Sequence, residues 1–206
     1  MISARTALEA LREGNRRFVG KLSRDAGSAR RLELPDGQQP LAIILGCSDA
    51  RVPAEIVFDQ GLGDLFVIRV AGNIVAPSQV GSVEFAAEAF GTRLVVVLGH
   101  SKCGAIRATL DQLVRPSREQ SRNLSSIVNR IRPAVEGLLE RGPLRDRQAL
   151  EQQAVRANIR MSADHLRHGS AVLEQLIQQD GLMVVGAEYS LETGVVDFFD
   201  GVPAAG

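Results

Sequence analysis

Five short runs of apolar residues divide the chain, and each is about as long as a β-strand. Polar residues, glycine and proline separate the runs, as Pro40 and Gly46 do on either side of the first. Runs this short and this uniformly apolar are typical of strands buried on both faces of a sheet. We therefore predict strands at residues 41–45, 65–70, 94–98, 182–186 and 195–199.

Helix-compatible segments lie between the first four runs. This alternation predicts an α/β fold with a mostly parallel central β-sheet flanked by helices. The last run follows the fourth after a few residues that include Gly194, so we expect an antiparallel edge strand at the C-terminus. Helices are predicted at residues 53–59, 80–90, 104–114 and most of 123–180, with a kink at Pro133 and a break at Gly142-Pro143.

A further amphipathic helix is predicted near the N-terminus, over residues about 6–19. Thr6 and Glu9 have the spacing of a capping box, and Leu8 and Leu11 recur with a helical period. We place the beginning of this helix at the capping box.

Length and composition favour a single domain over residues 1–206. Lys plus Arg and Asp plus Glu both number 24, so no net charge attracts nucleic acid or an anionic membrane, and a small-molecule substrate is expected.

The first residues lack the pattern of a signal peptide and no run approaches the ~20 apolar residues of a membrane span, so we expect a cytoplasmic protein. Two cysteines are too few for a disulfide framework.

Both cysteines lie in short motifs directly after predicted strands. The first motif is Cys47-Ser48-Asp49-Ala50-Arg51 and the second is His100-Ser101-Lys102-Cys103-Gly104. Because ligands bind at the carboxyl ends of parallel strands, we expect the two motifs to meet at one edge of the sheet. Two thiolates and an imidazole favour zinc, and three protein ligands with one open position are typical of a catalytic site. We predict one Zn²⁺ per chain.

With both motifs intact, the sequence resembles the β-class carbonic anhydrases. The resemblance extends to residues 53–55 and 66–73 and covers roughly residues 1–200. It implies reversible hydration of CO2 to bicarbonate by attack of zinc-bound hydroxide. The implied metal ligands are Cys47, His100 and Cys103, with Asp49 and Arg51 as the catalytic pair. For the substrate pocket, the resemblance implies Gln38 and Phe66, and the candidates for further pocket residues are Val52, Val70, Phe85 and Gly104.

Asp49 and Arg51 have chemistry that suits this role. A carboxylate can accept a hydrogen bond from the attacking hydroxide, and a guanidinium keeps that carboxylate ionised and oriented. In some relatives the Asp closes the site as a fourth metal ligand, driven by bicarbonate bound to a Trp, an Arg and a Tyr. Arg69 and Tyr189 match the last two, but Ile44 stands in place of the Trp, so we expect an open site with Asp49 paired to Arg51.

Parts of the same pattern also fit three other functions. The same metal site could hydrolyse carbonyl sulfide or carbon disulfide, which are linear molecules like CO2. A serine hydrolase using Ser101 would need a Gly-x-Ser-x-Gly turn, and here the fifth residue is Cys103. A zinc-stabilised binding module would need a fourth protein ligand, for which Asp49 is the nearby candidate. The resemblance also implies a homodimer or homotetramer in which the N-terminal helix reaches a partner chain.

Overall fold

A five-stranded sheet forms the centre of the computed structural model, which describes residues 2–22, 37–116, 121–140 and 146–204. The strand order is β2-β1-β3-β4-β5, with β1, β2, β3 and β4 parallel and β5 antiparallel to β4. This confirms the predicted mixed sheet with an antiparallel C-terminal strand. The strands are β1 (Ala42–Gly46), β2 (Leu65–Arg69), β3 (Leu94–His100), β4 (Met183–Tyr189) and β5 (Val196–Asp200).

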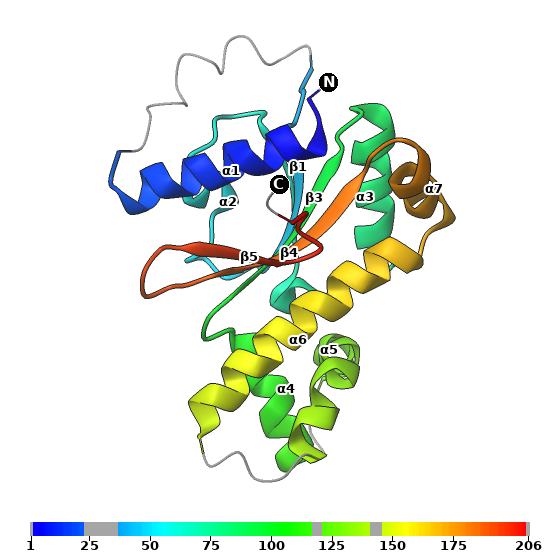
Figure 1. The fold of residues 1–206 in the computed structure, drawn as a ribbon. Helices are drawn as coiled ribbons and strands as arrows, with labels where there is room; N and C mark the ends of the chain where they lie inside the picture. Colours follow the sequence, from blue (N-terminus) through cyan, green and yellow to red (C-terminus); the bar gives the residue numbers. More distant parts are fainter. Residues whose placement is uncertain (1, 23–36, 117–120, 141–145, 205–206) are drawn as a thin grey trace.

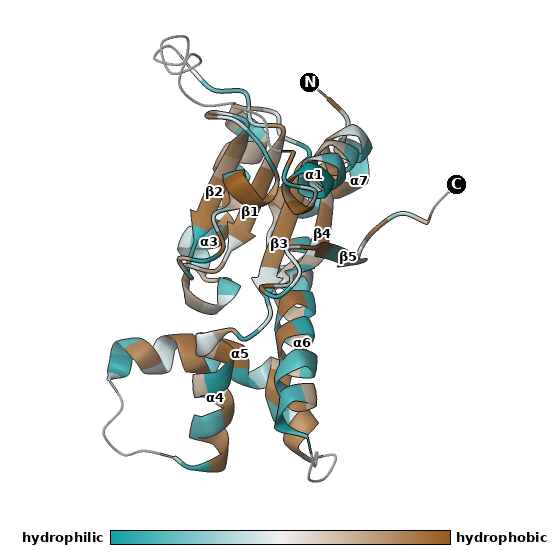
Figure 2. Cartoon of the chain, turned by 90° about the vertical axis from the view of Figure 1, so that its left-hand side faces the viewer, coloured by the Kyte–Doolittle hydropathy of each residue, from teal (hydrophilic) through white to brown (hydrophobic). Residues whose placement is uncertain are grey.

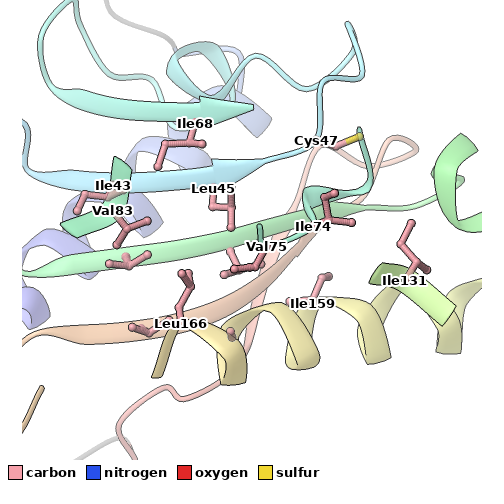
Figure 3. Packing of buried hydrophobic residues seen from close by; sticks show 14 of the residues in the cluster. Ile43, Leu45, Cys47, Ile68, Ile74, Val75, Val83, Ile131, Ile159 and Leu166 are labelled. Carbon is pink, nitrogen blue, oxygen red and sulfur yellow. The ribbon is translucent and has the colours of Figure 1, made fainter. Parts of the chain in front are cut away.

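Helices cover both faces of the sheet (Figure 1). Alternation along β1 sends Ile43 and Leu45 into one core and Ile44 into the other, which is the period of two expected of a strand buried on both sides. The Ile44 face packs against α1 (Ala4–Val19) and α2 (Ala54–Val57). The Ile43 face packs against α3 (Pro77–Ala89), α6 (Arg147–His168) and α7 (Ala171–Gln179). Figure 3 shows side chains of this second core.

Two helices, α4 (Gly104–Val114) and α5 (Arg122–Glu140), lie beyond the carboxyl ends of the strands (Figure 2). The long helix α6 spans the sheet and this second layer, because it packs against β3 and β4 as well as α4 and α5. Pro133 lies inside α5 without ending it, and Gly142-Pro143 is outside the described residues. Helices α4, α5 and α6 therefore lie next to the carboxyl edge of the sheet.

The N-terminal helix begins earlier than predicted. Ser3, and not Thr6, is its N-cap, since the Ser3 hydroxyl accepts the Thr6 backbone N–H at 3.1 Å. Thr6 therefore lies within the first turn. The apolar face of α1, with Leu8 and Leu11, is buried against its own sheet, and its reach toward a partner chain stays a prediction.

No helix in the described part of the chain is both long and apolar enough to cross a membrane.

Candidate metal centre

The two cysteine motifs meet at the carboxyl edge of the sheet. Cys47 follows β1 directly, His100 is the last residue of β3, and Cys103 is the N-cap of α4. Because β1 and β3 are neighbours in the sheet, their ends lie side by side. The three ligand atoms lie within 4.8 Å of one another, and all three residues are buried. Figure 3 shows Cys47 just past the end of β1, beside Ile74.

The donor set fits a zinc ion. Tetrahedral zinc with bonds of about 2.0–2.3 Å holds its ligand atoms roughly 3.8 Å apart, within the observed spread. The Nδ1 atom of His100 lies 2.9 Å from the Ser101 carbonyl oxygen, so it carries the proton and leaves Nε2 as the ligand atom. Within the described residues that buried Nε2 atom has no hydrogen-bond partner, as expected of an atom reserved for a metal.

Charge within the site also favours a cation. The adjacent Cys103 thiol lowers the pKa of Cys47 to about 4, with help from His100 and against the effect of burial. Cys47 in turn raises the pKa of Cys103 well above its ordinary value, and burial adds to this. The pair therefore loses one proton readily and keeps the second. A divalent cation would compensate for the two negative charges that its ligands must carry.

Asp49 and Arg51 form a bidentate ion pair beside the ligands. Arg51 Nε and Nη2 lie 2.9 and 2.8 Å from the two carboxylate oxygens, and the Arg51 backbone N–H also donates to Asp49. The Arg51 guanidinium holds the pKa of Asp49 well below its usual range. One carboxylate oxygen is 3.8 Å from His100 Nε2, so the ionised carboxylate faces the expected metal position.

Separate clamps hold the two ligand loops. Arg69, the last residue of β2, donates to the carbonyl oxygens of Cys47 at 3.1 Å and Asp49 at 2.6 Å. In the second loop, the Ser101 hydroxyl donates to Glu192 at 2.8 Å and the Lys102 ammonium lies 2.6 Å from the same carboxylate. Lys102 and Ser101 lower the pKa of Glu192 to about 2, so this carboxylate stays ionised. Both loops are therefore fixed to neighbouring elements of the sheet.

Three of the predicted pocket residues lie beside the ligand loops. The Val52 N–H bonds to the Asp49 carbonyl at 3.0 Å, and the Val70 N–H bonds to the Gly46 carbonyl at 3.1 Å. Gly104 follows Cys103 directly at the start of α4 and is exposed. Val70 and Gly104 can contribute to a pocket around the metal position of their own chain, whereas the Val52 side chain is buried in the core on the Ile44 face of the sheet.

The other three predicted pocket residues are remote from the ligands of the same chain. Gln38 is exposed before β1, so the five residues of that strand, roughly 16 Å in length, separate it from Cys47. Phe66 is near the beginning of β2, and its ring lies 6.2 Å from that of Phe85 on α3. Within one chain, none of these three side chains reaches the metal ligands.

Sequence reasoning overlooked two groups that contact the ligands or their loops. The Gly72 N–H donates to Cys47 Sγ at 3.4 Å, and Glu192 secures the loop between His100 and Cys103. Only the glycine had a local signal, since Gly72-Asn73 is a dipeptide typical of a tight turn. Glu192 lies about ninety positions along the chain from Ser101, and only the fold reveals its role.

Comparison with known proteins agrees with this geometry. A family profile described as carbonic anhydrase matches residues 42–196. Carbonic anhydrase 2 of Mycobacterium tuberculosis is 38% identical over 190 residues, which are 91% of this chain and 89% of that protein. A carbonic anhydrase of Mycolicibacterium smegmatis is 38% identical over 93% of this chain and 91% of that protein.

Solved structures give the same assignment. The β-carbonic anhydrase CafA of Aspergillus fumigatus superposes with a TM-score of 0.74 at 26% identity, over 84% of this chain and 81% of that one. A Coccomyxa β-carbonic anhydrase shares the fold with a TM-score of 0.73 over 97% of this chain and 87% of that one. With the fold, the ligand group and the matched length in agreement, the chain belongs to the β-class carbonic anhydrases.

Proposed function

We propose that this protein catalyses the reversible hydration of CO2 to bicarbonate and a proton with one Zn²⁺ per chain. The observation that carries the proposal is the buried Cys47, His100 and Cys103 group, whose ligand atoms lie within 4.8 Å of one another. A zinc ion held there would act as a Lewis acid that lowers the pKa of water toward neutrality. A reducing compartment such as the cytoplasm would keep both buried thiols free for this role.

The chain itself supplies the orientation and the charge. Asp49 would accept a hydrogen bond from the O–H of an oxygen next to the ligands, because its carboxylate is ionised and faces the His100 ring. Arg51 holds that carboxylate in one orientation through two hydrogen bonds. Because the pKa of this carboxylate is held low, its role here is to orient the attacking oxygen through a hydrogen bond rather than to carry the proton away. We infer the open form of the site, because Arg51 already holds both Asp49 oxygens.

We further propose that the complete pocket forms between chains. Gln38, Phe66 and Phe85 lie away from the metal ligands of their own chain, so they can line a pocket only at another chain's ligands. β-Carbonic anhydrases of Sordaria macrospora are described as tetrameric, and they share this fold with a TM-score of 0.71. A homodimer or homotetramer would then be a requirement for activity.

Bicarbonate should act on this protein only as a product. Ile44 is fully buried in the core under α1, and Tyr189 packs against Phe18 with ring centroids 6.5 Å apart. Arg69 is engaged with two backbone carbonyls. None of these groups is arranged as a free anion site.

Hydrolysis of carbonyl sulfide or carbon disulfide is the second candidate, because the same site chemistry would serve it. A serine hydrolase is disfavoured: the Ser101 hydroxyl donates to Glu192, and the adjacent His100 ring contacts the Ser101 carbonyl. That arrangement gives the hydroxyl no imidazole base.

The test combines metal analysis of the purified protein with stopped-flow CO2 hydration. We expect about one zinc per chain in the parent, and sharp losses of zinc in Cys47→Ser, His100→Ala and Cys103→Ser, because a three-ligand site depends on each ligand. Assays with carbonyl sulfide and carbon disulfide on the same preparation separate the two candidates. A protein that neither holds zinc nor regains it on reconstitution, and does not hydrate CO2, would refute the proposal.

A further inference from the structure

A tight turn presses a backbone amide against one of the ligand thiols. The turn is η2 (Ala71–Asn73), and its Gly72 N–H donates to the buried Cys47 Sγ at 3.4 Å. Gly72 and Asn73 have φ angles of 71° and 42°, so two successive residues are in the left-handed region. Such a conformation persists only when surrounding groups hold it.

The interior of the turn leaves little freedom. A Cβ added at Gly72 would lie 2.9 Å from Ile131 Cδ1 and 3.1 Å from Ala105 Cβ, so α4 and α5 press on the turn from one side. The Asn73 Nδ2 atom is buried without a partner within the described part of the chain. This donor therefore does not stabilise the turn.

Helix α6 supplies the bonds that hold the turn. Asn158 Nδ2 donates to the Gly72 carbonyl at 2.8 Å, and Ser162 Oγ donates to the Asn73 carbonyl at 3.0 Å. The two residues are one helical turn apart and are 2% and 5% exposed. Polar side chains buried among apolar neighbours such as Ile159 are costly unless they are bonded, and both bonds here go to η2.

We propose that Asn158, assisted by Ser162, is a positioning residue that aims the Gly72 N–H at the Cys47 thiolate and so sets how strongly this sulfur donates to the metal. A hydrogen bond to a thiolate draws charge from the sulfur, and the effect is large in a buried site of low dielectric. The Asn158 side chain acts from 86 positions away in sequence, through the Gly72 carbonyl. The proposal rests on the metal site of the proposed function.

Cobalt(II) substitution gives a direct measure of this effect. In the cobalt form, charge-transfer bands report the energy of the thiolate electrons. In Asn158→Ala the Gly72 N–H loses its fixed aim, so the sulfur becomes more electron-rich and its band should move to longer wavelength. The affinity for cobalt, measured by competition with a chelator, should change by about 10–100-fold, the usual range for groups just outside the ligand shell. Ser162→Ala should shift the band in the same direction by less, and it provides the test should Asn158→Ala not fold.

Asn15→Ala is the matched control. Asn15 is also a buried asparagine that donates to backbone carbonyls, those of Val57 and Gly194, but it lies on α1, away from η2. It should lower the unfolding temperature and leave the charge-transfer band unchanged. Unchanged bands in both α6 variants, or the same shift in Asn15→Ala, would overturn the proposal. A parent protein that binds no cobalt would instead refute the metal site itself, and the positioning role with it.

Discussion

Asp49 and Arg51 illustrate how two neighbouring residues divide one task. Asp49 is mostly buried beside the ligands, whereas the Arg51 side chain is 56% exposed. The contact between them is worth little as a stability term, because solvent screens an exposed ion pair. Its value lies in orientation and in keeping the carboxylate ionised.

Asp49→Asn should keep its zinc and lose at least about a hundredfold in the rate of CO2 hydration, the usual cost of removing a proton-accepting group. In Arg51→Ala the pKa of Asp49 rises toward its ordinary range, so protonation of this carboxylate should cost rate at a higher pH than it does in the parent. Arg51→Lys should fall between Arg51→Ala and the parent, since it restores charge without the bidentate geometry. Stopped-flow profiles with zinc analysis check this; a parent-like rate in Asp49→Asn across all pH values would exclude the catalytic pair.

Metal binding should release one proton from the thiol pair at neutral pH. Without metal the pair holds one proton at neutral pH, because the pKa of Cys47 is about 4 and that of Cys103 is raised. Zinc needs both thiolates. Burial lowers the pKa of His100, but Cys47, the Ser101 carbonyl and Asp49 together raise it, so His100 adds a second proton at lower pH. Affinity should therefore rise about tenfold to a hundredfold per pH unit as pH increases. Calorimetric titration of the metal-free protein in buffers of different ionisation enthalpy counts these protons, and a count of zero would contradict the coupling.

At the scale of elements, the packing of α6 on the sheet depends on two glycines. Ile159 lies over Gly99 of β3 and Gly186 of β4, where added Cβ atoms would come within 2.5 and 2.8 Å of its side chain. This close approach brings α6 near enough for Asn158 to reach η2. Small residues on the strands thus fix the distance at which the helix lies.

Gly186→Ala should destabilise the protein by about 1–3 kcal/mol, since the new methyl group forces Ile159 and Asp200 apart in a packed core. Gly81→Ala is the matched control, because Gly81 is exposed in the middle of α3 with nothing within 4 Å of an added Cβ. It should stabilise the protein by about 0.5–1 kcal/mol through helix propensity. Denaturant unfolding of both variants measures the difference. Equal stability in the two would show that the helix can move away without cost.

At the scale of the whole molecule, the site joins segments that are far apart in the chain. The candidate ligands lie at the ends of β1 and β3. The side chains that hold their loops come from β2 and from the turn between β4 and β5, and the side chains that hold η2 come from α6. Gln38, at the opposite edge of the sheet, is the predicted pocket residue least able to reach this site. A shared pocket between chains has a distinctive consequence.

Two inactive variants should restore activity when their subunits are mixed. A Gln38→Ala chain retains its metal ligands, and a Cys47→Ser chain retains Gln38, so each mixed dimer would contain one intact pocket and one doubly defective pocket. Random exchange should return about a quarter of the parent activity, because half of the dimers are mixed and each has one intact site of two. The assay is CO2 hydration after unfolding and refolding the two variants together, with each variant refolded alone as the control. No recovery would place the whole pocket within one chain.

The sequence by itself determined the strands, the fold class and the three candidate ligand residues that the structure brings together. Uniformly apolar strands are typical of a parallel sheet that helices cover on both faces. Motifs that directly follow strands of such a sheet lie at its carboxyl edge. The capping pattern at Thr6 placed the beginning of the N-terminal helix too late, because the Ser3 hydroxyl is an equivalent acceptor about one turn earlier. Local patterns of this kind are degenerate by a few residues.

Only the tertiary structure decided which groups contact the ligands. Asn158 has the local pattern of any helical asparagine, and its bond to the Gly72 carbonyl depends on how closely α6 packs over Gly99 and Gly186. The separation of Gln38 from Cys47 likewise follows from the length and direction of β1, which a motif nine positions away does not reveal. Periodicity reports which face of an element is buried, whereas the partner of each polar atom is set by long-range packing distances that no local pattern encodes.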